Sequence, residues 1–141
     1  MFLGEFQHSL DAKGRIILPS KFRALLESGL VISRGLDNCL WVMAQGDWNA
    51  WFERLREQMR IGDPRQRGFA RFIFSGASED RPDKQGRVSV PENLRKFAGL
   101  EREISVIGAG TRIEIWNRER WERKSAEAAE GMEENLGDLP F

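Results

Sequence analysis

Short apolar stretches alternate with turn residues along the first half of the chain, and their spacing predicts four strands and two helices. The expected strands span 4–10, 15–18, 30–32 and 39–43. Pro19 fits the first turn of a short helix that Gly29 ends. A longer helix is expected after Asp47, since its apolar residues recur at helical spacing: Trp48, Trp51, Phe52, Leu55 and Met59.

The second half repeats this order of elements. Strands are expected at 72–74, 87–90, 104–107 and 113–116, with a short helix from Pro91 to Ala98. A last helix begins near Asn117 and contains Trp121. From about residue 125 the apolar content is weak, so a frayed or disordered tail is expected.

A repeated phrase explains why the halves look alike. The segment Asp11–Arg23 (DAKGRIILPSKFR) returns 72 positions later as Asp83–Arg95 (DKQGRVSVPENLR). Trp48 and Trp121, 73 positions apart, extend the correspondence beyond this phrase. A segment that keeps turn, strand and helix starts in register is a repeated structural unit.

Each half alone offers too few elements to close a hydrophobic core. We therefore expect an α+β fold with pseudo-twofold symmetry, in which two tandem repeats build a small strand-rich barrel with flanking helices. The predicted units are a first half with its trailing helix (1–59), a connector (60–68), a second half with its trailing helix (69–124) and an acidic tail (125–141).

Charge and composition narrow the classes of protein. The 141 residues have zero formal net charge, but residues 1–121 carry 20 basic and 16 acidic side chains, and residues 122–141 carry 2 and 6. The acidic end is either a solvated terminus or a competitor for an acidic ligand. A lone Cys39 and a single histidine argue against an intrachain disulfide and the usual zinc site, so no metal or cofactor is expected. No apolar stretch is long enough for a membrane span and no signal peptide is evident, which favours a cytoplasmic protein.

The repeated turn carries the candidate chemistry. Asp11 and Gly14 occupy the first and fourth positions of a type I turn, as do Asp83 and Gly86 in the second copy. We expect each turn to be the tip of a hairpin that presents an arginine and a lysine: Arg15 with Lys13, and Arg87 with Lys84. Such a tip suits contacts to phosphates or to base edges in a DNA groove. A simple turn with a surface Asp–Arg ion pair is the alternative.

Other features favour structural roles. Arginines between positions 54 and 71 form either a solvated helix face and linker or a strip that binds phosphate. The tryptophans are expected in the core or at an interface. No nucleophile with a base, and no paired carboxylates, stand at a recognisable spacing, so the sequence predicts no enzyme.

Taken in order, several motifs resemble the MraZ family, whose members have two AbrB-like (SpoVT–AbrB) halves. They are Met1–Phe6, Asp11-x-x-Gly-Arg15-Ile-x-Leu-Pro19, Arg34–Leu40, Phe74–Ala77, Asp83-x-Gln-Gly-Arg87-Val and Glu114–Trp116. The resemblance covers roughly residues 1–124. It implies a swapped-hairpin AbrB-type fold in which one chain builds what relatives build from a dimer.

The same resemblance implies the function. It predicts a sequence-specific regulator, most simply a repressor, of the division and cell-wall gene cluster that includes its own promoter. Binding to short direct repeats in double-stranded DNA is implied, by a ring of identical chains associated with the nucleoid. Arg15 and Arg87 would be the DNA contacts, helped by Lys13 and Lys84, on turns shaped by Asp11, Gly14, Asp83 and Gly86. An AbrB-like protein-interaction module such as an antitoxin is the alternative.

Overall fold

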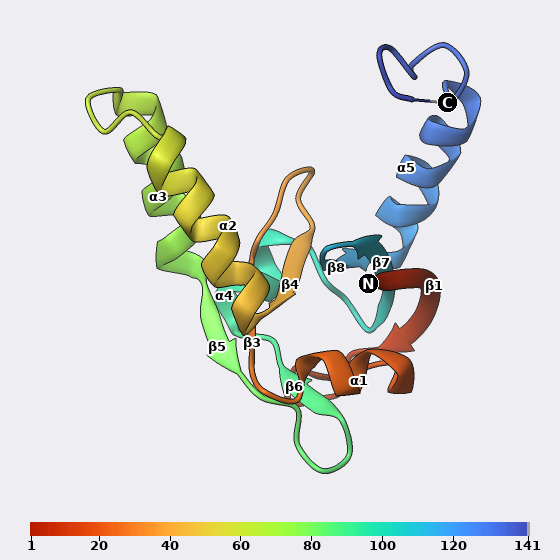
Figure 1. Ribbon diagram of the computed structural model, residues 1–141. Helices are drawn as coiled ribbons and strands as arrows, with labels where there is room; N and C mark the ends of the chain where they lie inside the picture. Colours follow the sequence, from red (N-terminus) through yellow and green to blue (C-terminus); the bar gives the residue numbers. More distant parts are fainter. Residues whose placement is uncertain (141) are drawn as a thin grey trace.

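The computed structural model describes residues 1–140, which form eight strands and five helices (Figure 1). In chain order they are β1 (Phe2–Ser9), β2 (Arg15–Ile17), α1 (Ser20–Leu26), β3 (Leu30–Arg34), β4 (Leu40–Ala44), α2 (Gln45–Gln58), α3 (Pro64–Gly76), β5 (Ser78–Asp80), β6 (Arg87–Ser89), α4 (Glu92–Phe97), β7 (Glu103–Gly110), β8 (Ile113–Asn117) and α5 (Arg118–Glu130). Pro19 and Pro91 lie just before α1 and α4, and Asp47 lies in the first turn of α2 rather than at its cap.

Two antiparallel sheets carry the symmetry between the halves. Six strands run in the order β1-β7-β8-β4-β3-β5, and β2 pairs with β6 in a separate two-stranded ribbon. The strands β1, β3 and β4 of the first repeat correspond to β5, β7 and β8 of the second. When each strand is replaced by its counterpart, the same strand order results, read from the opposite edge of the sheet. The predicted α+β fold with two related halves is therefore confirmed. The pairings leave β1 and β5 as the two edges of the six-stranded sheet, so they do not establish the predicted barrel.

One hydrophobic core is shared by both repeats. In β4, for example, Leu40 and Val42 face this core, whereas Trp41 and Met43 face the opposite side of the sheet, as the alternation of a strand requires. The ribbon and the short helices contribute related residues from each half, among them Ile16 with Val88, Leu18 with Val90, and Phe22 with Leu94. Both halves therefore contribute to one core, as expected from the few elements that each half offers.

A second apolar cluster lies on the other face of the six-stranded sheet. It is built on Cys39, Trp41, Met43, Ile107 and Trp116, all buried. Trp48 and Trp51 of α2 and Trp121 of α5 cover it. All five tryptophans of the chain belong to this cluster, in agreement with their predicted packing role.

The strand expected at 72–74 is wrong, because these residues belong to α3. The helix begins at Pro64, and the side chain of Asp63 accepts a hydrogen bond from the backbone N–H of Arg65 (2.9 Å). The predicted connector, residues 60–68, therefore contains the turn after α2 and the start of α3. α2 and α3 form an antiparallel pair that projects from the body (Figure 1).

The expectation of a frayed chain from residue 125 is wrong for its first part. Residues 125–130 continue α5, whose N-terminus is capped by Asn117 through a hydrogen bond from the N–H of Arg120 (3.0 Å). Phe141, the last residue of the predicted tail, lies outside the described residues. α5 and the α2–α3 pair project on one side of the molecule, and the loop between β5 and β6 projects on the opposite side (Figure 1).

Candidate functional site

The first repeated turn holds Arg15 in one orientation. Asp11 Oδ1 accepts hydrogen bonds from the backbone N–H groups of Lys13 (2.9 Å) and Arg15 (2.8 Å). Its other oxygen, Oδ2, accepts one from Arg15 Nε (2.9 Å). The turn is closed by Gly14 N–H, which donates to the Asp11 carbonyl (3.0 Å). The expected turn is therefore confirmed, and one carboxylate both shapes the turn and orients the guanidinium.

The second turn reproduces this geometry. Asp83 Oδ1 accepts from the N–H groups of Gln85 and Arg87 (both 2.9 Å), and Oδ2 accepts from Arg87 Nε (2.8 Å). Gly86 N–H donates to the Asp83 carbonyl (2.9 Å). The differences between the two tips, Ala-Lys and Lys-Gln, leave the hydrogen bonding of the turns unchanged.

These hydrogen bonds also set the charge state of the two carboxylates. The backbone N–H of Arg87, followed by its side chain, lowers the pKa of Asp83 to about 2. The pKa of Asp11 is lowered as well, chiefly by the backbone N–H of Arg15. Both aspartates are therefore ionised at neutral pH and keep the arginines paired.

Strand register brings the two arginines onto one face of the β2–β6 ribbon. Arg15 lies opposite Ser89, and Arg87 lies opposite Ile17. The residues between them, Ile16 and Val88, point into the core. Because side chains alternate along a strand, Arg15 and Arg87 share the outer face of the ribbon. They are diagonal neighbours across the two strands, and residues in this relation usually lie about 7–8 Å apart.

The expectation that each turn is the tip of its own hairpin is wrong. β1 pairs with β7, and β2 pairs with β6, so the strands flanking the first turn lie in different sheets. Instead the two turns are tied to each other. Leu18 N–H donates to the Gly86 carbonyl and Val90 N–H donates to the Gly14 carbonyl, both at 2.9 Å. The site is a single unit to which both repeats contribute.

Two further arginines support the turns from the opposite repeat. Arg23 donates through Nε to the Leu18 carbonyl (3.1 Å), and Arg95 donates through Nη1 to the Val90 carbonyl (2.5 Å). Their guanidinium groups lie directly against Gly86 and Gly14, respectively, where a Cβ would overlap them. Arg23 and Arg95 were not among the predicted site residues, although their matched places at the end of the repeated phrase were the available signal.

The four cationic residues of the predicted site have side chains that a ligand can reach. The side chains of Arg15 and Arg87 are 27% and 31% exposed, and Lys13 and Lys84 are exposed. Within residues 1–140, the terminal nitrogens of Arg15 and Arg87 have no hydrogen-bond partner, and neither lysine forms an ion pair. Each turn therefore offers free donors and positive charge at a fixed place, which is the chemistry needed to bind phosphates or acceptor atoms.

The basic run lies apart from this ribbon. Its arginines, between positions 54 and 71, belong to α2, α3 and the turn between them, which project away from the β5–β6 loop (Figure 1).

None of the helices within residues 1–140 combines the length and the apolar character that crossing a membrane requires.

Comparison with known proteins decides the family. A family model described as "MraZ protein, putative antitoxin-like" matches the chain twice, over residues 1–72 and 73–137. The chain belongs to the MraZ family. The double match also confirms the tandem repeat that the sequence predicted.

Curated relatives in the MraZ family match almost the whole chain. The transcriptional regulator MraZ of Acetivibrio thermocellus is 44% identical, and that of Desulforamulus reducens is 46% identical, each with 99% of both chains covered. The transcriptional regulator MraZ of Natranaerobius thermophilus is 46% identical over 94% of this chain and 92% of its own. These names agree with the expectation of a regulator rather than an enzyme.

Proposed function

We propose that this protein is a sequence-specific DNA-binding transcriptional regulator whose DNA contacts are Arg15 and Arg87. Lys13 and Lys84 bind phosphate beside them. The proposal joins two independent supports, the names of the full-length relatives and the free cationic groups on one ribbon face.

The observation that carries the proposal is the shared face of Arg15 and Arg87. A B-DNA major groove admits a two-stranded β-ribbon, and arginine is the residue that most often contacts guanine edges there. Each guanidinium uses Nε to bind its aspartate and keeps its terminal nitrogens for a ligand. The aspartate therefore restricts the arginine to one orientation before DNA arrives, which lowers the entropy lost on binding.

The target is proposed from the resemblance to the MraZ family. We propose that the protein binds short direct repeats upstream of the division and cell-wall gene cluster that includes its own gene, most simply as a repressor. It would act in the cytoplasm, at the nucleoid. The symmetric strand order supports the swapped-hairpin AbrB arrangement of the two halves.

We also propose that several copies assemble into a ring. The chain has no net charge, so one copy attracts DNA weakly through long-range electrostatics. A ring repeats the same cationic ribbon, and simultaneous binding to repeated sites converts weak contacts into strong ones. Binding would then weaken steeply with salt, because each engaged arginine or lysine releases counterions.

A gel-shift assay with DNA from upstream of the protein's own gene tests the proposal. The Arg15→Ala/Arg87→Ala variant is expected to lose the shifted band, whereas Arg123→Ala/Lys124→Ala, on an exposed face of α5, keeps it. Circular dichroism checks that both variants fold. Unchanged binding by a folded ribbon variant would refute the assignment of these arginines.

The family description favours one alternative, a protein-interaction module of the antitoxin kind. In that case residues 122–141 would cover a protein partner. A defined partner that binds the full chain stably, and is lost when these residues are removed, would support this reading. Upstream DNA would then bind no better than unrelated DNA.

A further inference from the structure

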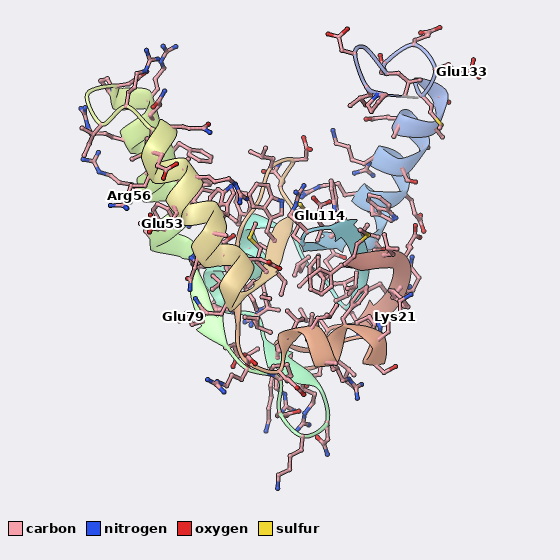
Figure 2. The ribbon with its side chains drawn as sticks, viewed as in Figure 1. Lys21, Glu53, Arg56, Glu79, Glu114 and Glu133 are labelled. Atoms are coloured by element: carbon pink, nitrogen blue, oxygen red, sulfur yellow. The ribbon has the colours of Figure 1, made fainter. Side chains whose placement is uncertain are left out.

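Two projections of the molecule have no role in the proposed DNA contact. We call residues 53–71, at the outer ends of α2 and α3, the hairpin arm, and residues 125–140, at the end of α5 and beyond, the C-terminal arm. In Figure 2, Glu53 and Arg56 mark the first arm and Glu133 marks the second, on opposite flanks of the body.

The two arms carry opposite charge. The hairpin arm has six arginines and three acidic residues, a net of +3. The C-terminal arm has five acidic residues and no basic one. The chain therefore has two separate surfaces of opposite charge, although its net charge is zero.

Much of this charge is unpaired within residues 1–140. Arg54 and Arg71 are exposed and form no ion pair, and Arg60 reaches Asp63 only at 3.8 Å. On the C-terminal arm, Glu127 lies 3.9 Å from Lys124. The remaining acidic residues of that arm, all exposed, form no ion pair: Glu130, Glu133, Glu134 and Asp138.

Exposed apolar side chains lie on both arms, as they also do elsewhere on the body. On and beside the hairpin arm, Ile61 is 75% exposed, and Phe52, Phe69 and Phe72 are also exposed. Met132 and Leu139 are exposed on the C-terminal arm (59% and 60%). Apolar groups rimmed by charge are typical of protein–protein contacts.

The arms of one chain do not satisfy each other. They leave the body on different flanks, and no ion pair joins them within the described residues (Figures 1 and 2). We propose that the C-terminal arm of one copy docks on the hairpin arm of a second copy of this chain. This proposal deepens the assembly proposed above and rests on it.

Such a contact joins two different surfaces, so it is head-to-tail. Each copy then offers one free hairpin arm and one free C-terminal arm, and repetition of the contact closes a ring when the rotation allows it. The arms project away from the β5–β6 loop, which leaves the ribbon free for DNA (Figure 1).

Sedimentation velocity without DNA tests the contact through charge reversal. One variant makes the C-terminal arm basic by Glu130→Lys/Glu133→Lys/Glu134→Lys. It is expected to sediment as smaller species than wild type. A control with the same change in net charge, Glu5→Lys/Glu27→Lys/Glu101→Lys on the body, is expected to assemble as wild type.

A second variant makes the hairpin arm acidic by Arg54→Glu/Arg60→Glu/Arg71→Glu and is expected to dissociate likewise. An equimolar mixture of the two arm variants restores both contacts, because each basic arm then meets an acidic arm of the other variant. The mixture is therefore expected to recover large assemblies. Raising NaCl from about 0.1 M to about 1 M shortens the Debye length from about 10 Å to about 3 Å, which should weaken the wild-type assembly.

A wild-type chain that sediments as a monomer would overturn the proposal, as would arm variants that assemble normally or a mixture that stays dissociated. A hairpin-arm variant that assembles normally but binds DNA less tightly would assign that arm to DNA instead. Arg15→Ala/Arg87→Ala is expected to assemble as wild type. Its assembly and its DNA binding therefore report separately on the contact between copies and on the proposed function.

Discussion

At the scale of single residues, Gly14 and Gly86 meet two demands at once. Both have positive φ (+75° and +79°), a conformation that side chains with a Cβ rarely adopt. Each also lies against an arginine of the other repeat, Arg95 and Arg23 respectively, whose guanidinium group a Cβ would have to displace. The turn glycines therefore set the backbone shape and also allow the two repeats to approach closely.

Substitution of Gly14 by alanine is expected to lower the free energy of unfolding by about 1–3 kcal/mol, because of backbone strain and displacement of Arg95. Gly46 is the matched control, since it lies in α2 with open space around its Cα. Gly46→Ala should stabilise by about 0.5–1 kcal/mol. Urea denaturation measures both, and equal effects of the two substitutions would contradict this account of the turn.

The stability that Asp83 of the second turn contributes should fall in acid. The folded pKa of Asp83, about 2, is below its ordinary value of 3.8, so the unfolded chain takes up the proton first as the pH falls. The stabilisation is fully present above pH 3.8 and is lost as the pH falls towards 2. The Asp83→Asn variant, which cannot titrate, should lose less stability over this window than wild type. A carboxyl carbon shift of Asp83 that titrates near pH 4 by NMR would refute the proposed pairing.

The residues of the turns could be predicted from the sequence, but their supports could not. Asp11, Gly14 and Arg15 interact within five consecutive residues, so local turn chemistry contains the information. Arg23 and Arg95 act on the turn of the other repeat. That contact depends on how the halves pack, which no local pattern encodes.

At the scale of elements, α3 shows how a local pattern misleads. Phe72, Ile73 and Phe74 are the residue types that strands favour, and they predicted a strand. The stronger signal was upstream, because Asp63 and Pro64 form a helix start with a cap and a proline at the first position. β5, in turn, was not expected, because Ser78–Asp80 lacks the apolar alternation of a strand.

One arginine fastens α3 to the sheet. Arg34, at the end of β3, donates to the Phe72 carbonyl (2.7 Å), and its guanidinium lies 4.4 Å from the Phe72 ring centre. It also packs directly on Gly76. This contact holds the C-terminal end of the helix against the first repeat.

Arg34→Ala is expected to release that end of α3. Loss of a hydrogen bond from a charged group costs about 1.5–3 kcal/mol, so protection of α3 amides from hydrogen exchange should fall roughly 10-fold to 150-fold. The amides of α5 serve as the internal control. Equal loss of protection in both helices would point to global destabilisation instead.

At the scale of the whole molecule, the two repeats are interleaved rather than merely adjacent. The first strand of each repeat pairs with the third strand of the other, as β1 pairs with β7 and β5 with β3. The tandem repeat and the shared core followed from the sequence. The exchange of strands between the repeats was implied only by the family resemblance, because similar repeats offer the same edges to themselves and to each other.

This interleaving gives the proposed DNA site its form. Without the β2–β6 pairing, Arg15 and Arg87 would belong to separate turns that could bind DNA independently. With it, they lie on one face of one ribbon and should act on the same stretch of groove. The central claim is that both repeats bind DNA through this single face.

The most direct test is the affinity of four proteins for one duplex from upstream of the protein's own gene, measured by fluorescence anisotropy at one salt concentration. They are wild type, Arg15→Ala, Arg87→Ala and the double variant. Each single variant should lose about 1–3 kcal/mol of binding free energy, which is roughly 5-fold to 150-fold in affinity. The losses in the double variant should not be additive, since neighbours on one surface are coupled. Folded single variants that bind as tightly as wild type would contradict the claim.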